Sequence, residues 1–159
     1  MGIAIDTSAL IELERSRERF TASLPDTSEE VLIPALVLAE LWIGVELADS
    51  EKQRAQRARH IEALLRGAAV LPFDECVAST YARLYAALRK AGTPLPANDL
   101  AIAASVVHFG HELLVGPRGE AHFGRVPGPK VRVLGADWTV CMRSSPHRLG
   151  PRGGPRREK

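Results

Sequence analysis

The sequence has little cysteine, few aromatic residues and no long apolar run. Its two cysteines, Cys76 and Cys141, form neither a metal-binding spacing nor a disulfide framework, and aromatic residues make up 5% of the chain. No apolar stretch reaches the roughly 20 residues that a membrane-spanning helix needs, and no basic segment followed by an apolar one opens the chain. These absences predict a cytoplasmic protein that does not enter a membrane.

Several common catalytic arrangements are also missing from the sequence. The five histidines show no metal-ligand spacing such as His-Glu-x-x-His, and Ser8 has no histidine beside it. No glycine-rich phosphate-binding loop occurs. A zinc hydrolase of that type, a serine nucleophile and a phosphate-loop enzyme are therefore disfavoured.

Composition is ordinary for a soluble domain, but the charge is unevenly distributed. Of the 159 residues, 45% are hydrophobic and 25% are charged, which fits one globular domain. Residues 143–159 hold six basic residues and one acidic residue, so this segment carries +5 and residues 1–142 carry −3 of the net +2. We predict a folded domain over 1–142 and a disordered basic tail over 143–159. The tail either contacts nucleic acid through its charge or is an inert extension.

Short apolar runs alternate with helical patterns along the domain. The predicted strands cover residues 3–5, 31–33, 68–71, 113–115 and 131–134, and the predicted helices cover 8–19, 35–45, 50–66, 76–91 and 98–107. This alternation predicts a three-layer α/β/α sandwich with a parallel five-stranded sheet. The carboxyl ends of the strands then meet at one edge, which is where open α/β sheets bind ligands.

Four acidic residues fall at that predicted edge. Asp6 follows the first strand, Glu40 lies in the helix after the second, Asp99 begins the helix before the fourth strand, and Glu120 follows the fourth. Each also has a purely structural alternative. Asp6 and Asp99 can cap helices, Glu40 can pair with a buried arginine, and Glu120 can be an ordinary loop residue.

Taken together, the four carboxylates favour a metal site. Carboxylates that converge in a partly buried cleft repel one another, and a divalent cation relieves this repulsion. Oxygen ligands of this kind suit Mg²⁺ or Mn²⁺. Such a cation at a phosphodiester activates water and neutralises charge on the phosphate, which predicts a nuclease chemistry.

Four segments together resemble a known family. They are Asp-Thr-Ser at 6–8, Pro-Ala-Leu-Val-Leu-Ala-Glu-Leu at 34–41, Asn-Asp-Leu-Ala-Ile-Ala-Ala at 98–104 and His-Phe-Gly-Arg-Val-Pro-Gly at 122–128. In this order they resemble the PIN domain, and more closely the toxin ribonucleases of prokaryotic VapBC toxin–antitoxin systems. The resemblance extends over about residues 1–135 and leaves out the tail.

The resemblance implies roles for particular residues. Asp6, Glu40 and Asp99 match the family's catalytic metal-site carboxylates, Thr7 matches a hydroxyl that supports the site, and Asn98 matches the residue beside the third acid. The family's usual Thr-x-Asp or Thr-x-Asn after the fourth strand is replaced here by Gly-Pro-Arg-Gly at 116–119. Glu120, the nearest acid, is therefore taken as the fourth catalytic and metal residue.

The resemblance also implies an activity and partners. The implied activity is Mg²⁺- or Mn²⁺-dependent endoribonuclease cleavage of a structured RNA such as tRNA or a ribosomal loop. The implied assembly is a homodimer that binds a small antitoxin, whose tail fills the active-site cleft. The apolar helix at 35–45 and the polar helix after it offer a groove for an amphipathic partner segment.

Two other classes of function stay open on the sequence. One is a phosphatase with Asp6 as the phospho-acceptor, which needs a second aspartate at position 8, where Ser8 stands. The other is a catalytically inactive PIN-like module that binds a partner protein through its helices.

Overall fold

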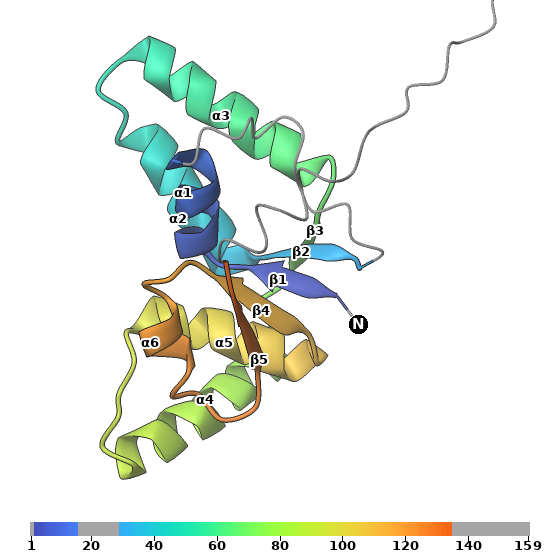
Figure 1. Ribbon diagram of the computed structural model, residues 1–159, viewed down its shortest axis with the longest axis vertical. Coiled ribbons are helices and arrows are strands. Elements are labelled where there is room, and N and C mark those ends of the chain that lie inside the picture. Colours follow the sequence, from blue (N-terminus) through green and yellow to red (C-terminus); the bar gives the residue numbers. More distant parts are fainter. Residues whose placement is uncertain (1, 16–28, 135–159) are drawn as a thin grey trace, which may run out of the picture.

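Five parallel strands form one sheet in the order β3-β2-β1-β4-β5 in the computed structural model (Figure 1), which describes residues 2–15 and 29–134. The strands are β1 (Ile3–Ile5), β2 (Val31–Pro34), β3 (Ala69–Leu71), β4 (Glu112–Val115) and β5 (Lys130–Val133). Ile3 lies opposite Val31 on one side and Glu112 on the other. The predicted parallel sheet of five strands is confirmed.

Within the residues that the structure describes, six helices cover the two faces of this sheet. They are α1 (Thr7–Arg15), α2 (Ala35–Glu46), α3 (Glu51–Leu65), α4 (Glu75–Lys90), α5 (Ala97–Phe109) and α6 (Glu120–Phe123). Figure 1 shows α1, α2 and α3 on one side of the sheet and α4, α5 and α6 on the other, which confirms the three layers. No helix in the described ranges is long and apolar enough to cross a membrane.

Within the described residues, the observed helix boundaries agree with the predicted ones to one residue except at the end of α5. Helix α5 runs two residues further than predicted, to Phe109, because it ends at Gly110, whose φ of 69° is the left-handed conformation of a helix C-terminus. The predicted continuation of the first helix to Arg19, the predicted domain end at 142 and the tail at 143–159 all lie outside the described residues.

Strand β1 is the centre of the hydrophobic core. Ile3, Ala4 and Ile5 are completely buried, because helices cover both faces of the strand. Helix α5 packs beneath the sheet with a nearly continuous buried surface that includes Leu100, Ile102 and small alanines. With β2 on one side of β1 and β4 on the other, the strand order reverses at β1, and open α/β sheets bind ligands at the carboxyl ends beside such a reversal.

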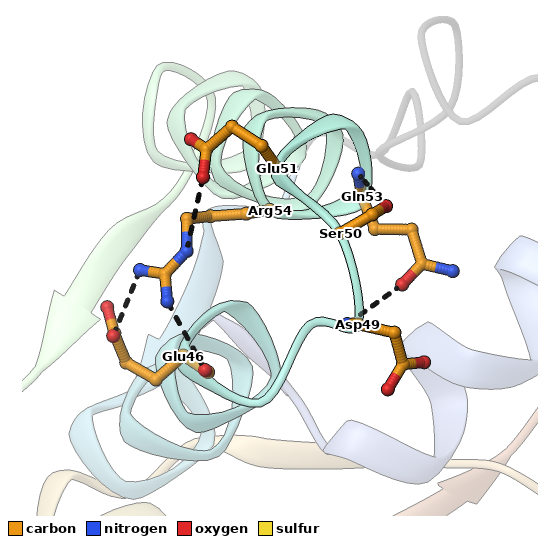
Figure 2. Close-up of polar contacts among 6 residues, drawn as sticks. All are labelled: Glu46, Asp49, Ser50, Glu51, Gln53 and Arg54. Atoms are coloured by element: carbon orange, nitrogen blue, oxygen red, sulfur yellow. Dashed lines mark hydrogen bonds and ion pairs between the residues drawn. The ribbon is translucent and has the colours of Figure 1, made fainter.

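A network of polar contacts fixes the corner between α2 and α3 (Figure 2). Ser50 caps α3, since its Oγ accepts the Gln53 backbone N–H at 3.2 Å, and the Gln53 side chain accepts the Asp49 N–H at 3.2 Å. Arg54 donates to Glu46 Oε2 at 3.0 Å and to the Glu46 carbonyl at 3.3 Å. Helix α3 is thereby folded back along α2.

A second network of ion pairs lies at the amino ends of β4 and β5 and holds the edge strand β5 in place. The side chain of Glu112 on β4 is almost buried, and it pairs with Arg132 and Lys130 on β5. Arg132 also makes a two-pronged contact with Glu29, with both distances 3.2 Å. This network ties β5 to β4 and to the segment before β2.

Candidate active site

Three of the predicted acidic residues come from three different elements to the carboxyl edge of the sheet. Asp6 directly follows β1, and Glu40 lies in the second turn of α2, which begins where β2 ends. Asp99 lies in the first turn of α5, and this helix leads back into β4, so its N-terminus lies at the same edge. The parallel topology therefore brings three residues that are distant in the sequence to the same edge of the sheet.

Asp6 is a buried carboxylate held by Ser8. It is 5% exposed, and its Oδ2 accepts the Ser8 backbone N–H at 2.9 Å and the Ser8 hydroxyl at 2.5 Å. The first of these bonds caps α1, so Asp6 is a helix cap, as the structural alternative expected, and it also lies in the site. Burial raises the pKa of Asp6, the two Ser8 bonds oppose this, and the nearby charge of Asp99 raises it further.

Glu40 is bonded to the neighbours of both aspartates. Its Oε2 accepts the Thr7 hydroxyl at 2.5 Å, and its Oε1 accepts the Asn98 amide at 3.1 Å. Thr7 follows Asp6 and Asn98 precedes Asp99, so Glu40 links the two sides of the site. Glu40 is therefore partnered by Thr7 of α1 and Asn98 of α5, and not by the buried arginine of the structural alternative.

Asp99 contacts a histidine that the sequence did not single out. His122 Nδ1, on α6, lies 3.0 Å from Asp99 Oδ2, and in the tautomer that carries its proton on Nδ1 the ring donates a hydrogen bond to this carboxylate. The helix-cap alternative for Asp99 is wrong, because Pro96 holds the N-cap position of α5 and no side chain caps it.

Glu120 lies at the rim of the site. It is the first residue of α6 and its side chain is exposed. The preceding Gly119 packs closely against Ser8, which places Glu120 next to the site without joining it to the other three acids.

The carboxylate oxygens at this site suit a divalent cation, although the side chains do not form a complete set of metal ligands. Within residues 2–15 and 29–134, no three Asp, Glu, His or Cys side chains are grouped so that they could hold a metal ion. Mg²⁺, however, commonly binds through one or two carboxylates and keeps several waters. Asp6 and Asp99, whose charges already act on each other, have the donor oxygens for this, with Glu40 beside them.

Sequence reasoning missed two residues of the site, Ser8 and His122. Ser8 bonds both Asp6 and the backbone N–H of Gly116, which lies 108 residues further along the chain. A serine two residues after an aspartate at a helix start is a signal for the first contact, but nothing local points to the second. His122 stands in the recognised His-Phe segment, yet its partner Asp99 depends on how α6 packs against α5.

A groove continues from this site between α1, α2 and α3. It has a volume of about 370 Å³, and Thr7 and Glu40 form part of its wall. Apolar side chains such as Leu10, Ile11 and Leu41 line it, with Arg57 from α3. The groove is therefore mainly apolar and connects directly with the acidic cluster.

Comparison with known proteins gives the family. A model of the PIN domain matches residues 3–115. Ribonuclease VapC1 of Rickettsia felis is 34% identical over 116 residues, which span 72% of this chain and 84% of that protein. Ribonuclease VapC of Rickettsia bellii is 30% identical over 127 residues, spanning 80% of this chain and 92% of that protein. The DNA-bound VapBC crystal structure from Salmonella typhimurium matches with a TM-score of 0.67 at 26% identity, over 84% of this chain and 98% of that chain. The chain belongs to the PIN domain family and, within it, to the VapC proteins.

Proposed function

We propose that the chain is a divalent-metal-dependent endoribonuclease, the toxin of a toxin–antitoxin pair, that hydrolyses RNA phosphodiester bonds. The observation that carries this is the convergence of Asp6, Asp99 and Glu40 in a family whose relatives are named ribonucleases. A structured RNA such as tRNA or a ribosomal loop is the proposed substrate class.

Each residue of the site has a separate task in this proposal. Asp6 and Asp99 would hold Mg²⁺ or Mn²⁺ directly, and Glu40 would complete the shell directly or through water. When bound, the cation supplies activation of a water molecule and neutralisation of charge on the phosphate. Thr7 and Asn98 fix the Glu40 carboxylate from two sides through their hydrogen bonds. Glu120 would act from the rim, through water or on a second and weaker metal.

The test is cleavage of total RNA by the purified chain with Mg²⁺ or Mn²⁺, with and without EDTA. We expect cleavage that EDTA abolishes, and we expect Asp6→Asn, Glu40→Gln and Asp99→Asn each to abolish it while the fold is kept. Asp49→Asn, which changes an exposed aspartate at the α2–α3 corner, is the matched control and should cleave normally.

Three results would contradict this proposal. Cleavage that persists in EDTA would exclude the metal mechanism, and phosphate trapped on Asp6 would favour the phosphatase class. A folded chain that never cleaves RNA but binds a partner protein would favour the inactive interaction module.

We further propose that the chain forms a homodimer and that the groove between α1, α2 and α3 receives an amphipathic segment of a small antitoxin. The apolar lining and the opening toward Glu40 support this, because a segment in the groove can extend into the acidic site.

Ile11→Asp should weaken co-purification with the antitoxin encoded in the same operon. Val70→Asp on β3 is the control, since both side chains are 42% exposed and Val70 does not line the groove. A strictly monomeric chain that co-purifies with no such protein would refute the assembly.

A further inference from the structure

The segment that follows β4, residues 116–123, ends with α6 and contacts the site at both of its ends. At its start, the Gly116 N–H donates to Ser8 Oγ at 2.9 Å, and the same Ser8 hydroxyl donates to Asp6 Oδ2. Near its end, His122 Nδ1 lies 3.0 Å from Asp99 Oδ2, which is hydrogen-bond distance. One short segment therefore reaches both aspartates, one through Ser8 and the other through His122.

The first contact depends on the two glycines of this segment. A Cβ on Gly116 would lie 2.6 Å from the Ser8 carbonyl oxygen, and a Cβ on Gly119 would lie 2.7 Å from Ser8 Oγ. Contacts this short cannot be accommodated without a shift of the backbone at Gly116 or of the Ser8 hydroxyl at Gly119. The glycines thus allow the segment to approach Ser8 closely enough for its hydroxyl to accept one hydrogen bond and donate the other.

The second contact is set by the packing of α6. Phe123 is buried in the core, and α6 lies against α5 and β5. Because Phe123 anchors this one-turn helix, the adjacent His122 is directed toward the first turn of α5, where Asp99 lies. The His122 ring itself remains about half exposed.

We propose that Ser8 and His122 are positioning residues that hold the carboxylates of Asp6 and Asp99 in the orientation that binds the cation. This inference rests on the proposed metal-dependent activity. The two aspartates repel each other, so unrestrained side chains would turn apart. A hydrogen bond to one oxygen of each carboxylate prevents this and orders the ligands before a cation arrives, as outer partners do in metal sites.

The test measures metal binding separately from activity. We expect Ser8→Ala and His122→Ala to raise the Mn²⁺ dissociation constant, measured by calorimetry on the full chain, by about 10- to 100-fold. Cleavage should then need correspondingly more Mn²⁺ and recover largely at saturating metal. His122→Asn should restore most of the affinity, because its amide nitrogen can donate from nearly the position of Nδ1.

Ser105→Ala is the matched control for Ser8. Ser105 is equally a serine whose hydroxyl is hydrogen-bonded inside the protein, to the Ala101 carbonyl at 3.2 Å, but it does not touch the acids. Its removal should leave Mn²⁺ affinity unchanged. If Ser8→Ala fails to fold, the exposed His122 and its two variants decide the question.

The measurements distinguish failure of the positioning role from failure of the proposed function. If the unmutated chain binds Mn²⁺ and cleaves RNA but Ser8→Ala and His122→Ala bind Mn²⁺ equally well, the positioning role is refuted. If His122→Asn is as weak as His122→Ala, the Nδ1 hydrogen bond is not the cause and the inference fails. If the unmutated chain neither binds Mn²⁺ nor cleaves RNA, the proposed function itself fails.

Discussion

At the residue scale, Asp6 combines a structural and a chemical position. It caps α1 through the Ser8 N–H, yet it is a buried carboxylate next to the charge of Asp99. A cap alone needs no burial, since the backbone donor it satisfies can equally be solvated. The negative charge of Asp6 therefore destabilises the folded chain until a cation binds.

This cost predicts a pH-dependent stability gain for Asp6→Asn. Burial raises the folded-state pKa of Asp6, so the folded chain binds its proton more tightly than the unfolded chain does. Stability is then lost as pH rises from the ordinary aspartate pKa through the raised one, and Asp6→Asn removes that loss. In EDTA at pH 7, urea should unfold Asp6→Asn at a higher concentration than the unmutated chain, and the difference should shrink as pH falls toward about 4.

Adding Mn²⁺ should reverse that order, because a ligand that binds only the folded state stabilises the chain that binds it more tightly to a greater extent. Asp49→Asn serves as the control and should show no such pH dependence. A destabilised Asp6→Asn at pH 7 with no dependence on pH would show that the burial cost is not the dominant effect.

Glu120 gives the second prediction at this scale. Because it is exposed on the rim, Glu120→Gln should lower activity by about tenfold at limiting Mg²⁺ or Mn²⁺ and should cleave nearly normally at saturating metal. Glu75→Gln is the control, since Glu75 is likewise an exposed glutamate at the first position of a helix. A metal titration of Glu120→Gln that matches the unmutated chain would make Glu120 an ordinary loop residue.

At the element scale, two arginines with similar partners differ in what they stabilise. Arg54 joins α2 to α3 through Glu46, whose side chain is 68% exposed, whereas Arg132 joins β5 to β4 through Glu112, which is 9% exposed. Exposed ion pairs contribute little because water already solvates both charges. Arg132 itself is 40% exposed, but removing it takes the closest partner from a nearly buried carboxylate, whose charge is then poorly compensated.

Arg132→Ala should therefore cost far more stability than Arg54→Ala. We expect a loss of about 3 kcal/mol in the free energy of unfolding for Arg132→Ala. For Arg54→Ala we expect less than about 1 kcal/mol. Urea denaturation of both variants measures the difference. Equal losses would mean that Lys130 and solvent compensate Glu112 fully in the absence of Arg132.

At the scale of the whole molecule, the proposed catalytic and positioning residues all lie within residues 6–122, and residues 143–159 carry a net charge of +5. Removing residues 143–159 should leave the metal-dependent cleavage rate at saturating RNA unchanged. If the tail contacts RNA, truncation should weaken RNA binding mainly at low salt, because that contact is electrostatic. Cleavage and binding at two salt concentrations measure both effects, and loss of cleavage on truncation would contradict the prediction.

The order of strands and helices and the placing of three acids at one sheet edge were predictable from the sequence, because both depend on local patterns. Apolar runs, helical periodicity and breaks at glycine or proline mark the elements, and parallel strands share an edge whatever their order. The partners of Glu40 were decided only by the tertiary structure, since Thr7 and Asn98 lie 33 and 58 residues away. The same holds for His122 against Asp99 and for Gly116 against Ser8. Such contacts follow from how β1, β4, α5 and α6 pack, and packing depends on the whole core rather than on any one segment.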